Sequence, residues 1–244
     1  MADDPLAASF VALASYDWGG DPAPLKALDS AVAAATADAN RRADLERRLL
    51  AVVGAAASRA AKDIACRHLR LIGSAMSVPA LAEFLSDDDF AHMARFALER
   101  IDGPEAGEAL RAALPAAAKH EIAIGIMSSL AARRDHAAVP VLAGLLIGPE
   151  PLAAAAALAL GRIASPVAAA ALVAAAPTSD TVAAAVADAR IACGQSLLAA
   201  GDRAAAEPLF AAVSAAVGDT PTTRRNRSLR MAARGGLLDC LADA

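Results

Sequence analysis

A leucine pair that recurs about every thirty residues constrains the fold of this chain more than any other feature. Five segments align on a first leucine, and a second leucine follows each first one twelve residues later. Stacked helix pairs give this period, because each pair buries its apolar face against its neighbours. The sequence therefore predicts an all-α chain, a right-handed α-solenoid of stacked antiparallel helix pairs with about 12 to 14 helices. The pairs are Leu69 and Leu81, Leu98 and Leu110, Leu130 and Leu142, Leu160 and Leu172, and Leu197 and Leu209, with steps of 29, 32, 30 and 37 residues.

Composition supports helices over strands. Hydrophobic residues make up 57% of the chain and most of them are alanine, which has the highest helix propensity of all residues. β-branched residues never alternate with polar ones over the length of a strand, so no sheet is expected.

Capping and breaking residues set the expected helix boundaries. Ser58 and Ser77 are expected to cap helices, and Gly235-Gly236 to break or kink the last one. In the charged helix 40–53 the polar side chains, including Glu46, are expected to face water. A linker-like turn is expected over 218–223. The main expected helices are 5–15, 24–37, 40–53, 90–101, 105–114, 120–132, 139–147, 152–163, 167–175, 181–199, 203–217 and 226–241.

Three regions are expected along the chain. Residues 1–57 form a divergent N-terminal helical cap, 58–176 carry the regular repeats, and 177–244 form longer C-terminal helical repeats and a second cap. Terminal repeats are irregular in such arrays because one of their faces lacks a neighbour.

The repeat resembles a known family. The run LRLIGSAMSVPALAEFL within residues 65–85, the segment Val139-Pro140-Val141-Leu142 and the segment Leu160-Gly161-Arg162-Ile163 resemble the HEAT repeat. The chain also looks like the alanine-rich HEAT-repeat proteins of bacteria. This resemblance implies an armadillo-like helical scaffold whose B helices, the second of each pair, line the concave side, and it carries over no catalytic residue. Residues 200–213 also look like a tetratricopeptide turn, although the period departs from the roughly 34 residues of that family.

No catalytic, cofactor or metal site is predicted. The four histidines are spread along the chain, and the three cysteines, an odd number, give no disulfide framework. The turn Asp87-Asp88-Asp89 is interpreted as a solvated cap of the next helix rather than an ion site. No nucleophile motif or glycine-rich phosphate loop is present.

Arginines are the candidate binding residues. Those at the C-terminus form a candidate docking patch for an acidic partner, with a solvated last helix as the alternative. Arg133 and Arg134 also stand at a helix end, where cations stabilise the terminal carbonyls. The candidate partner-binding residues are Arg67, Arg70, Arg95, Arg100, Arg133, Arg134 and Arg162, and the candidate docking residues are Arg224, Arg225, Arg227, Arg230 and Arg234.

These observations favour a non-catalytic protein-protein interaction scaffold with a protein partner. The net charge of −4 argues against a nucleic-acid partner, and no uninterrupted apolar run is long enough to span a membrane. Two alternatives remain open. One is a HEAT-like enzyme or accessory subunit, resembling alkylated-base DNA glycosylases or bilin lyases, and the other is a structural module of a larger polypeptide. The N-terminus lacks the features of a signal peptide, which fits a cytoplasmic protein or a trimmed periplasmic one.

Overall fold

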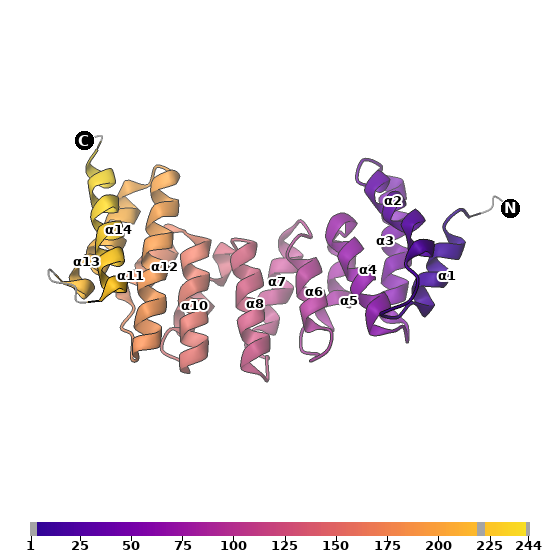
Figure 1. Ribbon diagram of the computed structural model, residues 1–244, viewed down its shortest axis with the longest axis horizontal. Coiled ribbons are helices and arrows are strands. Elements are labelled where there is room, and N and C mark those ends of the chain that lie inside the picture. The colour runs from indigo at the N-terminus through magenta and orange to yellow at the C-terminus, as the bar shows by residue number, and fades with distance from the viewer. Residues whose placement is uncertain (1–3, 219–222, 243–244) are drawn as a thin grey trace. The chain divides into compact units, whose positions relative to one another are not determined.

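The computed structural model describes residues 4–218 and 223–242, and these residues are helical and contain no strand (Figure 1). The prediction of an all-α chain is therefore confirmed. Most of the expected linker at 218–223 lies outside the described residues. The α-helices are α1 Ala7–Ser15, α2 Lys26–Ala35, α3 Ala39–Gly54, α4 Arg59–Ile72, α5 Val78–Ala82, α6 Ala91–Leu98, α7 Pro104–Ala113, α8 His120–Ala132, α9 Val139–Leu145, α10 Glu150–Ile163, α11 Pro166–Ala174, α12 Asp180–Ala199, α13 Arg203–Val217 and α14 Arg224–Leu241. Short 3-10 segments, η1 Ala23–Leu25, η2 Ala75–Ser77 and η3 His136–Ala138, lead into α2, α5 and α9.

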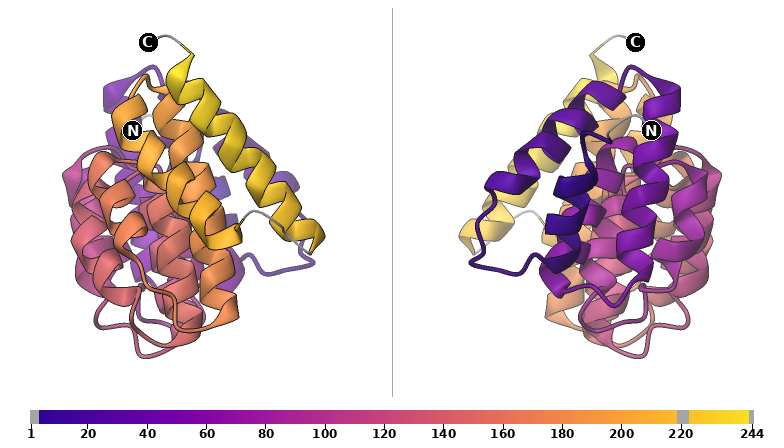
Figure 2. Two further views of the ribbon diagram at one scale, coloured as in Figure 1. Left: turned by 90° about the vertical axis from the view of Figure 1, so that its left-hand side faces the viewer. Right: turned by 90° about the vertical axis from the view of Figure 1, so that its right-hand side faces the viewer.

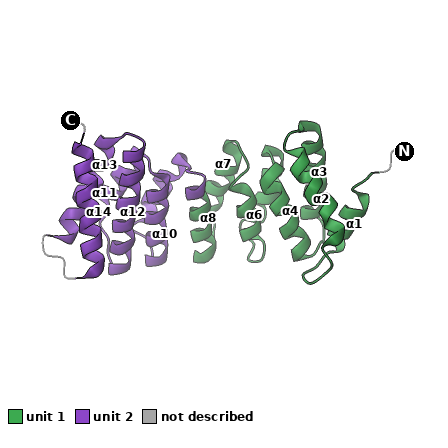
Figure 3. Cartoon of the chain, turned by 45° about the horizontal axis from the view of Figure 1, so that its top comes forward, with its two compact units in different colours: residues 1–129 green, residues 130–244 purple. Residues whose placement is uncertain are grey.

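The chain divides into two compact units, unit 1 at residues 1–129 and unit 2 at residues 130–244 (Figure 3). The boundary falls within α8, so the last turn of that helix belongs to unit 2. The helices that carry the first leucine of each pair in the sequence are called B helices below, and they are α4, α6, α8, α10 and α12. The helices that carry the second leucine are called A helices, and they are α5, α7, α9, α11 and α13.

Within each unit, B helices pack against B helices and A helices pack against A helices. In unit 1, α4 packs against α6, α5 packs against α7, and α3 covers the other side of α4. In unit 2, α10 packs against α12, and α11 contacts both α9 and α13. The last helix, α14, packs against α13 and α12.

The ten repeat leucines form the core of these contacts. Leu197 is 4% exposed and the other nine are fully buried. Each fully buried leucine side chain contributes about 1.5–3 kcal/mol relative to an exposed one, so the two leucine columns are a large part of the apolar driving force. The expectation that the paired leucines point inward is confirmed.

Serine side chains begin several of the helices. The Ser58 hydroxyl accepts a hydrogen bond from the Ala61 amide, which confirms the expected cap of α4. Ser165 and Ser179 cap α11 and α12 in the same way. Each of these bonds satisfies an amide that the first turn of a helix leaves without an intrahelical partner.

Two expectations about polar side chains are wrong, one for Glu46 on α3 and one for Ser77 at the start of α5. Glu46 is 2% exposed instead of facing water, and Ser77 makes no capping bond. The Ser77 hydroxyl donates to the Glu46 carboxylate at 2.6 Å, and the Ser74 amide donates to the same carboxylate at 2.7 Å. Glu46 thus satisfies donors of the turn between α4 and α5, which is the condition for burying a carboxylate.

The expected break at Gly235-Gly236 is also wrong, because α14 runs unbroken from Arg224 to Leu241. The Phe210 ring of α13 is fully buried, and a Cβ at Gly236 would come within 2.5 Å of it. A Cβ at Gly194 in α12 would come within 2.7 Å of the same ring. The two glycines therefore let α12 and α14 approach the ring closely, and they do not interrupt their helices.

Candidate functional site

The side of each B helix opposite its repeat leucine faces solvent. An α-helix turns about 100° per residue, so the positions two before and two after that leucine lie close together on the opposite side. We call these the outward positions. Nine of the ten outward side chains are exposed, and the tenth, Phe96, is half-buried.

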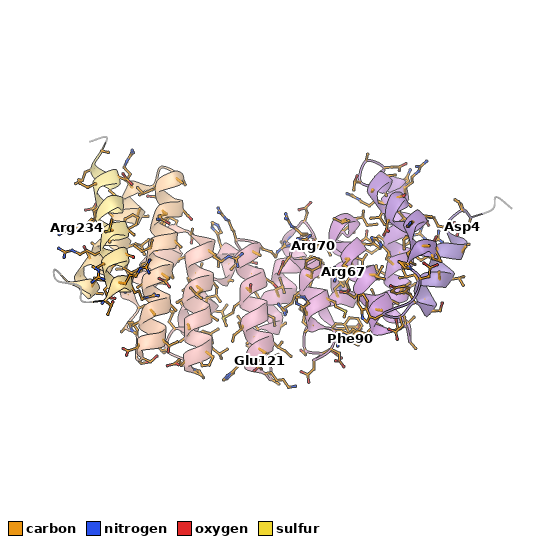
Figure 4. The ribbon with its side chains drawn as sticks, in the orientation of Figure 1. Asp4, Arg67, Arg70, Phe90, Glu121 and Arg234 are labelled. Atoms are coloured by element: carbon orange, nitrogen blue, oxygen red, sulfur yellow. The ribbon has the colours of Figure 1, made fainter. Side chains whose placement is uncertain are left out.

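Two B helices of unit 1 carry one arginine and one large apolar side chain at their outward positions. Arg67 and Leu71 are the pair at α4, and the Leu71 side chain is 61% exposed. Phe96 and Arg100 are the pair at α6 and the turn that follows it. The Arg67 side chain pairs with Asp63 one turn earlier, at 2.8 Å, whereas the Arg100 side chain makes no hydrogen bond or ion pair with any described residue. Figure 4 shows Arg67 on the solvent-facing side of α4.

Unit 2 repeats the same combination once. On α10, Leu158 is 47% exposed and Arg162 is exposed one turn later. Within the described residues, the Arg162 side chain also has no hydrogen-bonding or ion-pairing partner. The other outward positions carry small or uncharged polar side chains, namely Ser128, Ala132, Gln195 and Ala199.

Arg70 and Arg95 are half-buried between neighbouring B helices of unit 1. The Arg70 guanidinium carbon lies 4.3 Å from the centre of the Phe96 ring, which holds that ring at its outward position. The Arg95 guanidinium lies against α8 at Gly125, where any Cβ would collide with it. Burial lowers the pKa of Arg95, and the neighbouring Glu99 carboxylate opposes that shift. The Nε atoms of both side chains are buried and have no hydrogen-bond partner among the described residues.

Arg133 and Arg134 end α8. Arg134 adopts a left-handed conformation with φ 51°, and its amide donates to the Ala131 carbonyl. The Asp135 amide donates to the Leu130 carbonyl, which completes a Schellman-type helix end in which arginine stands where glycine is usual. The Asp135 carboxylate accepts from the Ala138 amide and so begins the next segment.

A cavity of about 320 Å³ opens between α2 and α4 in unit 1 and is next to Arg67. His68 lines it and is 8% exposed, and its Nε2 atom lies 3.3 Å from the Asp29 carboxylate without a well-formed hydrogen bond. Burial lowers the pKa of His68, while Asp29 raises it. The other lining residues are Tyr16, Pro22, Leu25, Lys26 and Ile64. No sequence pattern predicts this cavity, because its walls come from helices about 40 residues apart.

Unit 2 contains a buried arginine that the sequence analysis did not single out. Arg190 on α12 is 8% exposed, and its guanidinium donates to the carbonyls of Leu172, Val173 and Ala175 at 3.0, 3.3 and 3.2 Å. These carbonyls end α11, so the side chain caps a neighbouring helix and complements its dipole. A lone arginine in an alanine-rich helix is the only sequence signal for such a role.

The five C-terminal arginines all lie on α14. Arg225 is tied to α12, because its guanidinium pairs with Asp188 at 2.8 Å and donates to the Ala184 carbonyl at 3.0 Å. Arg230 is half-buried and faces the side of the helix that packs on unit 2. The remaining three, Arg224, Arg227 and Arg234, are exposed.

The described residues contain no group of three or more side chains suited to hold a metal ion. In the acidic turn, the Asp87 carboxylate accepts from the amides of Asp89 and Phe90, whereas α6 itself begins at Ala91 without a side-chain capping bond, so the expected cap of that helix is not observed. One described helix, α12, is long and apolar enough to cross a membrane by length and composition, and half of its apolar window is buried inside the structure. Comparison with known protein families and with characterised proteins finds no match to this chain.

Proposed function

We propose that this chain is a non-catalytic protein-binding scaffold, and that the outward positions of its B helices hold an acidic segment of a partner protein. The observation that carries the proposal concerns the two outward positions of each B helix. In three of the five B helices, one of the two positions carries an arginine and the other a large apolar side chain. The pairs are Arg67 with Leu71, Phe96 with Arg100, and Leu158 with Arg162. Each unit has at least one such pair, so neither unit depends on the other for its contact.

The same proposal assigns the chain a right-handed, HEAT-like α-solenoid. In support, B helices pack on B helices and A helices on A helices within each unit, and the paired leucines between them are buried. This is the contact pattern of arrays in which each repeat touches only its neighbours. In HEAT-like arrays the B helices line the concave side, so the proposal places the partner there.

The chemistry of the outward pairs favours a polypeptide with carboxylates. Arginine and aromatic side chains are enriched in the centres of protein interfaces, whereas charged residues other than arginine are depleted there. A guanidinium can bind a carboxylate through two parallel hydrogen bonds, and an adjacent Leu or Phe side chain buries apolar surface next to it.

The proposal includes no catalytic step, and the described cysteines support this choice. Burial raises the pKa of Cys66 to about 12 and that of Cys193 to about 11, so neither thiol supplies a reactive thiolate at neutral pH. Trp18, the one tryptophan, lies in the turn after α1 and is not one of the outward positions. A glycosylase-like base pocket needs aromatic side chains close to a carboxylate, and the outward pairs include only one aromatic residue.

A charge-matched comparison tests the binding surface. Peptides selected by display on the intact chain would be synthesised and titrated against two triple variants by fluorescence anisotropy. In one variant Arg67, Arg100 and Arg162 become Gln, and in the control the exposed α3 residues Arg41, Arg42 and Arg47 become Gln. We expect acidic peptides to be selected. The first variant should weaken their binding about tenfold or more, because bidentate arginine contacts are lost, and the control should change it less than twofold.

Two results would count against the proposal. Equal weakening by both triple variants would show that overall charge, and not the outward positions, governs binding. Selection of peptides without carboxylates would remove the role given to the arginines. Circular dichroism of each variant checks that the helices remain intact, which is expected because all six arginines are exposed.

A further inference from the structure

The last helix, α14, presents a continuous stripe of six side chains to solvent. Its members are spaced alternately three and four residues apart, which places them on one face of a helix. Two arginines stand at the N-terminal end of the stripe and two leucines at its C-terminal end, with Met231 and Arg234 between them. Met231, Leu238 and Leu241 are 75%, 67% and 65% exposed, far more than is usual for side chains of their size in a folded chain. We call this set the α14 stripe, and it consists of Arg224, Arg227, Met231, Arg234, Leu238 and Leu241.

Contacts on the other side of α14 fix the direction in which the stripe points. Ala233 and Gly236 are buried, and Gly236 lies against the fully buried Phe210 ring. Arg225 ties the first turn of the helix to Asp188 on α12. Rotating α14 to bury the stripe would break all of these contacts. The left view of Figure 2 shows α14 in front of the other helices of unit 2, and Figure 4 shows Arg234 at the edge of that unit.

The charge of the helix indicates what covers the stripe. α14 contains five arginines and one acidic residue, Asp239, in a chain whose net charge is −4. A second copy of α14 packed against the first would bring like charges together, which is unfavourable in a desolvated contact. An anionic membrane surface is a poorer fit, because interfacial helices separate their cations from their apolar face, whereas here Arg227 and Arg234 lie in line with Met231.

We propose that the α14 stripe binds an acidic amphipathic helix of a partner protein. The partner helix would place apolar side chains at intervals of three and four residues against Met231, Leu238 and Leu241. Its Glu or Asp side chains would then flank that seam and pair with the guanidinium groups of Arg224 and Arg234. This is helix-to-helix packing related to that of coiled coils, with the difference that the arginines of α14 lie within the stripe and the carboxylates that select the pairing lie on the partner. The site is separate from the outward positions of the B helices.

The probe is a fluorescent synthetic peptide of about 21 residues, three heptads, with Leu at the seam and Glu beside it. It is titrated against the full chain by anisotropy at low and moderate salt. We expect saturable binding that weakens as salt is raised. A matched peptide with Lys in place of every Glu should not bind.

Three single variants separate the contributions. Leu238→Gln should weaken binding roughly tenfold or more, because it removes a leucine side chain that the bound helix would bury. Arg234→Gln should weaken binding about three- to tenfold. Ala232→Glu is the control: like Arg234→Gln it lowers the net charge by one, but position 232 is half-buried and lies about 100° around the helix from Met231. We expect it to change binding less than twofold. Positions 234 and 238 are exposed, so the unfolding midpoints of those two variants should stay close to that of the parent chain, and the unfolding midpoint of Ala232→Glu is measured beside them.

Other outcomes would overturn the proposal. Equal binding of the Glu and Lys peptides would show that charge does not select the partner. Concentration-dependent dimerisation in sedimentation velocity that Leu238→Gln abolishes would assign the stripe to a second copy of the chain. Co-sedimentation with phosphatidylserine vesicles, lost in Leu238→Gln and without peptide binding, would assign it to a membrane. The triple variant at Arg67, Arg100 and Arg162 should leave peptide binding to the stripe unchanged, so this proposal and the proposed function can fail independently.

Discussion

Two adjacent glycines in α14 should respond oppositely to the same substitution. Gly235→Ala adds a methyl group that meets nothing within 4 Å, so it should stabilise the chain by about 0.5–1 kcal/mol, the usual gain in helix propensity. Gly236→Ala gains the same propensity, but its Cβ would come within 2.5 Å of the Phe210 ring. Overpacking of this kind costs about 1–3 kcal/mol. Since the propensity contribution is common to both variants, the difference between their unfolding free energies isolates the collision.

Urea unfolding followed by circular dichroism measures that difference. We expect Gly236→Ala to unfold at a lower urea concentration than Gly235→Ala, with a gap of about 1–3 kcal/mol. Adding Phe210→Leu to each variant should shrink the gap, because the smaller side chain leaves room for the methyl group. Equal midpoints for the two alanine variants would refute the claim that Gly236 is required for close approach to Phe210.

Three further predictions follow from buried polar groups. Arg190→Met should lower the unfolding free energy by roughly 1–3 kcal/mol in urea titrations, because it leaves helix-end carbonyls without donors. Burial lowers the folded pKa of His68 below the unfolded value of 6.5, so its contribution to stability is present above pH 6.5 and is lost as the pH falls. His68→Gln should therefore flatten the fall in stability between neutral and mildly acidic pH, and an unchanged profile would contradict this. With a thiol reagent in the absence of denaturant, Cys240, which is half-buried, should react first, and the buried Cys66 and Cys193 should react only on unfolding.

Much of the fold could be predicted from the sequence. Paired leucines and serine caps are local signals that can be read along the sequence, and the expected bounds of α8 and α13 match the observed ones. The burial of the repeat leucines also followed, because an apolar column at a fixed period has no other stable location.

The errors at Glu46 and Gly236 concern contacts between distant segments. Glu46 was expected to face water because its neighbours in the charged helix are solvated, and the positions of Ser74 and Ser77, 28 and 31 residues later, explain its burial. Gly236 was expected to break α14 because glycine is a weak helix former, whereas its role depends on the ring of Phe210 in another helix.

The sequence points to the arginines of the candidate site, but it does not show which of them are exposed and which are half-buried. Arg67 and Arg70 are three residues apart on one helix, yet the first is exposed and the second stacks on Phe96. The two side chains leave α4 at different angles around the helix axis. Only the position of the neighbouring helix α6 shows which of these two directions is covered and which faces solvent. Arg190 shows the same limit, since its carbonyl partners lie on another helix.

The outward positions have a practical consequence for engineering. Their side chains cover no leucine of the repeat, so their identity can change at little cost to the packing beneath them. Exchanging Arg100 and Arg162 for glutamate would reverse the local charge at two exposed sites and leave both leucine columns intact. Under the proposed function, these two exchanges would turn binding from acidic toward basic partner segments, with no redesign of the interior.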